Sequence, residues 1–194
     1  SDAMFRSMTH RPADPVGSGA LLRGRHHSRG GGGRGGRHLT LDMTRASACA
    51  TILECIRNGV TTIFDHHASF CEIPGSLFAI KDVAKALGMR VMLDGVFSHV
   101  GDDSVYFNRR GTHGEHIGAF RDPNSPYYKW FTFKNWPSEY DCWWGFRTLP
   151  NVNEMDEDFR RHILNGEDAV IKHWVRQGTS GWRLDVADEL PMEF

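Results

Sequence analysis

The sequence predicts an α/β fold for residues 39–194, an incomplete (βα) barrel in which strands and helices alternate. Short runs rich in apolar and β-branched residues predict parallel strands near 60–64, 90–97 and 181–186. Helical periodicity fills the segments between them, and glycines stand where the helices should stop. A complete barrel of eight strands needs about 250 residues, whereas this sequence has 194. We therefore expect part of a barrel, and its open sheet edges predict self-association.

The first 38 residues differ in composition from the rest. They contain nine glycines and seven arginines, with little apolar content to offset the entropy of ordering. We therefore expect residues 1–38 to form a disordered Gly/Arg-rich arm. Such an arm either binds RNA through phosphate attraction and arginine stacking or is an inert leader, and its shortness and near lack of aromatic residues favour the leader.

Charge and cysteine content limit the classes of function. Seven arginines against two aspartates give +5 for residues 1–38, which leaves −6 of the total −1 for residues 39–194 and disfavours nucleic acid as a partner. The four cysteines form no C-x-x-C pair and no metal-binding spacing, so we expect reduced thiols and a cytoplasmic location. No run of eighteen apolar residues predicts a membrane span, and the N-terminus lacks the apolar core of a signal peptide. We predict no cofactor.

A first helix is predicted over residues 41–57. Thr40 can cap its N-terminus, and Asn58-Gly59 supplies the stop. The apolar positions on one face are Leu41, Ala48, Cys49, Ile52, Leu53 and Ile56. The β-branched run of residues 60–64 follows directly after this stop and predicts a strand.

A second helix is predicted after that strand, with Ser76 as its cap and Gly88 as its stop. Its inward positions are Leu77, Ile80, Val83, Ala84 and Leu87. Together with the strands on either side, this helix predicts a right-handed βαβ unit.

Residues 101–149 form a long stretch with little periodicity and many aromatic residues. A stretch of this kind indicates a functional excursion from the fold. Helical periodicity returns over residues 156–177, with a break at Asn165-Gly166 and an end at Gly178. This helix leads into the third predicted strand.

The third strand carries the clearest chemical pattern in the sequence. Arg183 and Asp185 are two residues apart, so their side chains point to the same face of the strand. An arginine beside a carboxylate keeps it ionised and fixes its orientation, which a carboxylate nucleophile requires. The alternative is a structural ion pair at a strand end.

Three ordered motifs resemble the alpha-amylase family, glycoside hydrolase family 13, in its neopullulanase and cyclomaltodextrinase branch. They are Asp94–His99, Leu149–Glu154 and Gly181–Glu189, and the resemblance runs from about Arg90 to Phe194. The family is built on a (βα)₈ barrel, so the resemblance agrees with the predicted fold.

The resemblance implies a role for each matching residue. Asp185 would be the nucleophile that attacks an α-linked glucan, and Arg183 its orienting partner. His99 would bind the glucose unit in the cleaved subsite, and Asp94 would brace the strand end. Ser98 departs from the family, which usually carries Asn there, and this puts in doubt the local hydrogen bonding and any nearby calcium ion.

Two tryptophans add to this interpretation. Flat aromatic faces stack on sugar rings, so Trp143 and Trp144 are candidate walls of a groove for an α-glucan oligosaccharide. The alternative is that the aromatic residues of 101–149 form a small core under a long loop.

The general acid of the reaction has no clear candidate. A retaining glycosidase needs two carboxyl groups about 5–5.5 Å apart, and the resembled family supplies the acid from the next barrel strand, beyond Phe194. Asp188 and Glu189 follow Asp185 too closely to face it across a sugar, and Glu193 lies in a tail. We therefore expect at most trace hydrolase activity from this sequence.

Residues 39–90 resemble a second family, the metal-dependent amidohydrolases of the chlorohydrolase and aminohydrolase type, through the run Gly59–Ser69. This resemblance makes an amidohydrolase fragment the alternative function and an inert partial barrel a third. The sequence then reads as a chimera, amidohydrolase-like over 39–90 and glycosidase-like over 91–194. Because His66 and His67 are adjacent, they point in opposite directions on an extended chain, and we predict no metal site.

Overall fold

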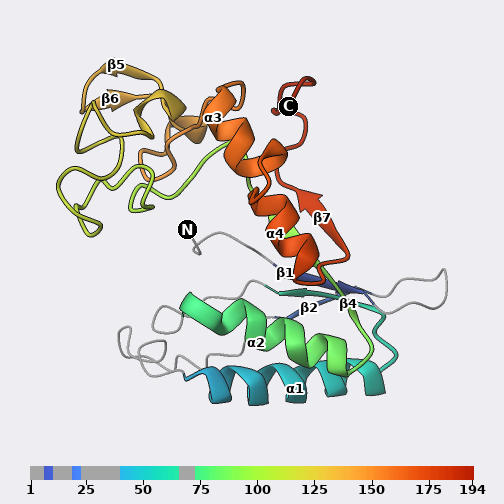
Figure 1. The fold of residues 1–194 in the computed structure, drawn as a ribbon. Coiled ribbons are helices and arrows are strands. Elements are labelled where there is room, and N and C mark those ends of the chain that lie inside the picture. Colours follow the sequence, from blue (N-terminus) through green and yellow to red (C-terminus); the bar gives the residue numbers. More distant parts are fainter. Residues whose placement is uncertain (1–6, 11–18, 23–39, 66–72) are drawn as a thin grey trace.

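The computed structural model describes residues 7–10, 19–22, 40–65 and 73–194 of the chain (Figure 1). Its main sheet has five strands in the order β2-β3-β1-β4-β7. These strands are β1 (Ser7–His10), β2 (Gly19–Leu22), β3 (Thr62–Asp65), β4 (Arg90–Gly95) and β7 (Gly181–Leu184). Strands β2, β3, β4 and β7 run in one direction, and β1 runs against them. The sheet is therefore part of an α/β architecture with parallel strands, as predicted.

The position of β1 departs from the sequence prediction. We expected residues 1–38 to be a disordered arm and the strands near 60–64 and 90–97 to form one right-handed, parallel βαβ unit. Instead β1 pairs with β3 on one side and with β4 on the other, and β2 pairs with the far side of β3. The physical reason is that β3 and β4 each have a row of backbone N–H and C=O groups available for pairing. The four-residue strand β1 pairs with β3 along one edge and with β4 along the other. The remainder of the arm lies outside the described residues.

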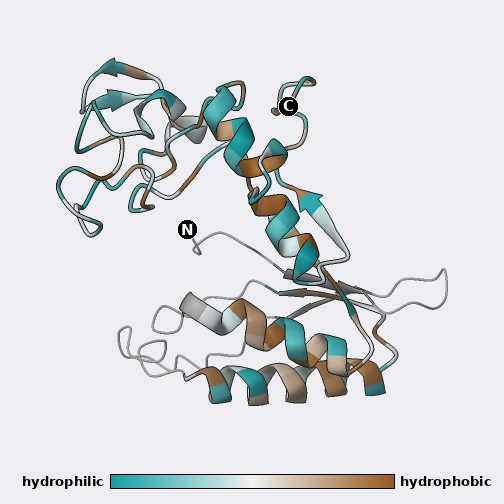
Figure 2. Ribbon diagram, viewed as in Figure 1, coloured by the Kyte–Doolittle hydropathy of each residue, from teal (hydrophilic) through white to brown (hydrophobic). Residues whose placement is uncertain are grey.

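Two helices cover one side of the sheet, α1 (Leu41–Arg57) and α2 (Ile73–Ala86), and they pack against each other (Figure 1). Hydrophilic and hydrophobic residues alternate along both, as in helices with one buried face (Figure 2). Thr40 caps α1 by accepting a hydrogen bond from the Met43 amide at 3.3 Å, and Gly59 follows with a φ of +73°. The predicted bounds of this helix are confirmed.

The predicted start of the second helix is wrong. The helix begins at Ile73, so Ser76 lies inside α2 and does not cap it. Its side chain is buried. Its stop is confirmed, since Gly88 adopts a φ of +76° beyond the last turn. The core between these helices and the sheet consists of Ile52, Ile63, Ala84, Met89, Val91, Leu93 and Trp174.

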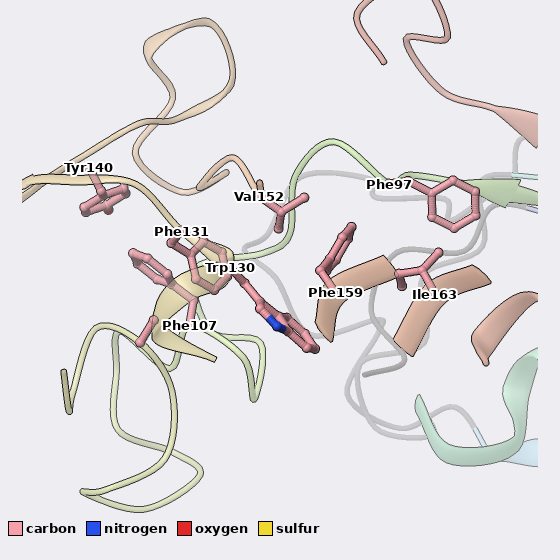
Figure 3. Close-up of a cluster of buried hydrophobic side chains, with 9 residues drawn as sticks. Phe97, Phe107, Trp130, Phe131, Tyr140, Val152, Phe159 and Ile163 are labelled. Carbon is pink, nitrogen blue, oxygen red and sulfur yellow. The ribbon is translucent and has the colours of Figure 1, made fainter. Parts of the chain in front are cut away.

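The chain leaves the sheet after β4 and builds a separate lobe over residues 101–149 (Figure 1). Its regular elements are short: η2 (Tyr128–Trp130), β5 (Phe133–Asn135), β6 (Glu139–Tyr140) and η3 (Trp143–Gly145). A cluster of buried aromatic side chains fills it, including Phe107, Trp130, Phe131 and Tyr140 (Figure 3). The interpretation of most of these aromatic residues as a core is therefore correct.

The chain returns to the sheet through α3 (Glu157–Arg160), a π-helical turn η4 (Arg161–Asn165) and α4 (Val170–Arg176). Gly166 separates η4 from α4, which confirms the predicted break. The Trp174 ring of α4 stacks on Phe78 of α2 with ring centroids 5.0 Å apart. This contact places α4 beside α2 and leads the chain into β7. Within the parts of the chain that the structure describes, no helix is long and apolar enough to cross a membrane.

Candidate functional site

The candidate site lies where the parallel strands β4 and β7 end. Asp94 is paired in register with Arg183, and Gly95 with Leu184. The Asp185 amide donates to the Gly95 carbonyl at 3.1 Å, which extends the pairing by one step. The carboxyl ends of parallel strands meet at one edge of a sheet, so the two motifs are brought together by backbone pairing alone.

Arg183 joins two carboxylates at this edge. Its Nη1 donates to Asp94 Oδ1 at 2.8 Å and also to Asp185 Oδ1. The Asp94 side chain is only 2% exposed, and that of Asp185 is 18% exposed. The hydrogen bonds that Arg183 donates to the two carboxylates, first that of Asp94 and then that of Asp185, raise the pKa of its guanidinium above the ordinary value. The prediction that Arg183 and Asp185 share one face is confirmed, and Asp94 is the buried member that holds the arginine in place.

His99 follows β4 and is buried. Its Nδ1 lies 2.9 Å from the Ser98 hydroxyl, so the residue that departs from the family pattern makes a local hydrogen bond to the histidine ring. Burial lowers the pKa of His99, while the negative charges of Asp185 and Glu189 oppose that shift. His99 is therefore electrostatically coupled to the carboxylate of the third motif.

The second and third motifs are joined to the first by backbone contacts. His99 forms an isolated antiparallel bridge with Asn151, and the Val152 amide donates to the Ser98 carbonyl at 3.0 Å. Residues 149–154 therefore run beside the segment that follows β4. All three motifs singled out in the sequence converge on one place in the fold.

Trp143 and Trp144 border the site from the aromatic lobe. The Trp143 ring stacks on His99 with centroids 5.1 Å apart, and on Trp144 with centroids 5.5 Å apart. Trp144 is 77% exposed. These two residues therefore stand apart from the buried aromatic core of the lobe, and their role as walls of a groove stays a prediction.

Glu189 is a site residue that the sequence analysis missed. Its two carboxylate oxygens accept hydrogen bonds from the indole nitrogens of Trp143 and Trp144, at 3.1 and 3.0 Å. From its spacing to Asp185 we considered this residue only as a general acid, and the spacing excludes that role. Nothing in the spacing signals a contact that spans about 45 residues.

The histidines considered as metal ligands in the sequence follow the end of β3. His66 and His67 lie outside the described residues. Within the described residues, no group of three or more His, Cys, Asp or Glu side chains is arranged to hold a metal ion. Asp65 is described, and burial raises its pKa to about 6 from an ordinary value of 3.8.

The arrangement can support attack by a carboxylate on carbon. Asp185 is partly exposed and held by a cation that is itself fixed by a buried carboxylate. These features define a class: an α/β protein with parallel strands that carries an arginine-oriented, partly exposed carboxylate at the carboxyl ends of its strands. The chain belongs to the alpha-amylase family, because the alpha amylase catalytic domain matches residues 74–193, more than half of its length.

Two relatives found by sequence agree with this assignment. An amylopullulanase from Thermoanaerobacterium saccharolyticum is 36% identical over an alignment of 129 residues that covers 57% of this chain and 10% of the relative. The intracellular maltogenic amylase of Bacillus subtilis (strain 168) is 30% identical over 55% of this chain and 17% of its own length. Among solved structures, the type III pullulan hydrolase from Thermococcus kodakarensis is 32% identical with a TM-score of 0.47, over 60% of this chain and 19% of that chain. The chain spans between a tenth and a fifth of the length of these relatives.

The family match corrects the interpretation of the chain as a chimera. It begins at residue 74, inside the segment 39–90 that we interpreted as amidohydrolase-like, and it runs without interruption through the expected seam near residue 90. Helix α2 and strand β4 therefore belong to the same family match as the catalytic motifs. Neither the amidohydrolase resemblance nor the seam is supported.

Proposed function

We propose that this chain carries the nucleophile-bearing part of a retaining glycoside hydrolase that acts on α-glucans. The observation that supports the proposal best is the Arg183 guanidinium bridging Asp94 and Asp185 at the ends of two paired parallel strands. This arrangement orients one partly exposed carboxylate and leaves the other buried. The relatives named amylopullulanase and maltogenic amylase support the substrate class.

In this proposal Asp185 attacks the anomeric carbon of a glucose unit. A bond forms between its carboxylate oxygen and that carbon, while the glycosidic bond breaks and its electron pair leaves with the departing oxygen, which takes up a proton. Arg183 fixes the direction of attack. Burial lowers the pKa of His99, and its ring offers a nitrogen to a sugar hydroxyl beside the nucleophile.

Two carboxyl groups near this end of the sheet do not fit the role of proton donor. Both oxygens of Glu189 already accept indole hydrogen bonds. Asp65 ends β3, which is three strands away from β7 in the sheet order. At about 4.8 Å per strand this places its backbone roughly 14 Å from the nucleophile strand, beyond the separation of about 5–5.5 Å that a retaining pair needs. We therefore propose that residues 1–194 hydrolyse unactivated glucans at trace rates at most.

The test compares substrates that differ in their need for a proton. The chain is assayed on maltotriose and pullulan and on an aryl α-glucoside with an activated leaving group. We expect slow release from the aryl glucoside alone, abolished by Asp185→Asn and preserved in Asp188→Asn, which removes a neighbouring exposed carboxylate. Release that survives Asp185→Asn would contradict the assignment of the nucleophile. Turnover of pullulan at ordinary enzyme rates would contradict the proposed lack of an acid.

The remaining expectations on partners and location belong to the same proposal. The three described cysteines, Cys49, Cys55 and Cys142, are free thiols, which supports a cytoplasmic location. The charge of −6 over residues 39–194 supports a neutral ligand such as an oligosaccharide over nucleic acid.

A further inference from the structure

Glu189 joins the nucleophile strand to the aromatic lobe. One carboxylate oxygen accepts the Trp143 indole hydrogen at 3.1 Å, and the other accepts the Trp144 indole hydrogen at 3.0 Å. The three side chains come from two segments that meet only in the folded chain. A carboxylate accepts hydrogen bonds more strongly than a neutral group, so each oxygen fixes the edge of one ring.

The rings held in this way continue a series that starts inside the site. His99 is buried and stacks on Trp143 with an interplanar angle of 23°, and Trp143 stacks on Trp144 at 29°. The series ends at Trp144, which is 77% exposed. An exposed tryptophan normally has several ring orientations available, whereas this one has a neighbour on its face and an acceptor at its nitrogen.

The backbone at both ends of this contact is in an unusual conformation. Trp144 has a φ of +49° and Val186 a φ of +42°, and they are two of the three non-glycine residues with positive φ among those that the structure describes. Val186 lies directly after the nucleophile and accepts the Glu189 amide at 2.9 Å in a tight turn. Conformations of this kind persist only where the surroundings hold them, and they gather at binding and catalytic sites.

We infer that Glu189 is the positioning residue of a sugar-binding platform formed by Trp143 and Trp144. It holds both indole rings in fixed orientations before ligand arrives, so that a glucose unit adjoining the one attacked by Asp185 stacks on the exposed Trp144 ring, which is already ordered. Ordering the rings in advance lowers the entropy lost on binding. This inference rests on the proposed function, because it assigns the platform to the same α-glucan.

The substitutions follow from the two hydrogen bonds. Glu189→Ala removes both acceptors, whereas Glu189→Gln keeps the shape of the side chain and one acceptor oxygen, because its amide nitrogen can only donate. Asp188→Asn is the matched control, since it removes the same charge from the neighbouring exposed residue. Trp144→Ala identifies the spectroscopic signal of the ring pair.

The experiment measures two quantities on the full chain. Exciton-coupled circular dichroism of the stacked indoles reports ring order without ligand, and calorimetry with maltotetraose reports binding. We expect Glu189→Ala to lose the exciton signal as Trp144→Ala does and to bind maltotetraose about tenfold more weakly, with Glu189→Gln in between and Asp188→Asn unchanged.

An unchanged signal and unchanged affinity in Glu189→Ala would overturn the inference. If the parent chain itself fails to bind maltotetraose, the proposed function fails, and the exciton signal still decides whether Glu189 orders the rings. The two failures are therefore distinguishable.

Discussion

The region built from the sheet with α1 and α2 and the lobe of residues 101–149 are held together in different ways. The first buries aliphatic side chains such as Ile52, Ile63 and Val91 between helices and strands. The second has only short regular elements and is filled by aromatic rings around Phe107. The candidate site lies where the two meet: the strand ends bring the charged groups, and the lobe brings the tryptophans. The first region fixes the position of Asp185, and the second shapes the surface beside it.

The largest effect is expected from a substitution that disrupts the packing of the aromatic lobe. Phe107 is fully buried and contacts the rings of Phe120, Phe131, Phe133 and Tyr140. We expect Phe107→Ala to lower the free energy of unfolding by about 3–5 kcal/mol. Urea unfolding followed by near-ultraviolet circular dichroism of the aromatic residues measures this loss.

The matched variant for Phe107→Ala is Ile63→Ala, which removes a fully buried side chain from the sheet region. We expect the Phe107 variant to lose maltotetraose binding while the far-ultraviolet helical signal persists, and the Ile63 variant to lose helical signal first. Identical unfolding curves by both signals in both variants would contradict the description of two separately held regions.

A smaller effect concerns the sheet region and depends on pH. Burial raises the pKa of Asp65 to about 6 in the folded chain, above the 3.8 of an exposed carboxyl. The stability that the protonated form contributes is therefore fully present below about pH 3.8 and is lost as the pH rises through about 6. The difference corresponds to about 2–3 kcal/mol.

The test of Asp65 is urea unfolding at pH values from 4 to 7. We expect Asp65→Asn to be the more stable protein at pH 7 and the advantage to vanish near pH 4. Asp82→Asn, on the exposed face of α2, should show no such pH dependence. An advantage of Asp65→Asn that stays constant with pH would rule out ionisation as its cause.

The smallest expected effect is a change in the pKa of His99, which lies where the two regions meet. Burial lowers the pKa of His99, and the charges of Asp185 and Glu189 oppose the shift. Removing either charge should therefore lower the pKa of His99 further. Titration of the His99 ring by nuclear magnetic resonance in Asp185→Asn and Glu189→Gln measures the change, and a rise in either variant would contradict this electrostatic coupling.

Local patterns determined a large part of this protein from sequence. Thr40 and Gly59 mark the two ends of α1 and could be identified from sequence, because helix capping and a glycine in the left-handed conformation depend only on adjacent residues. Arg183 and Asp185 share a face because strand alternation depends only on their spacing. Their contact with Asp94 was not predicted, because it depends on the pairing of β4 with β7.

Tertiary structure alone decided how the distant segments combine. The placement of β1 between β3 and β4 depends on which strand edges are free to pair. The residue pattern of Ser7–His10 carries no information about those edges. The missed role of Glu189 has the same origin, because its partners lie about 45 residues away. Periodicity reports which residues are buried, whereas pairing between distant polar groups is set only when the chain brings two segments into hydrogen-bonding distance.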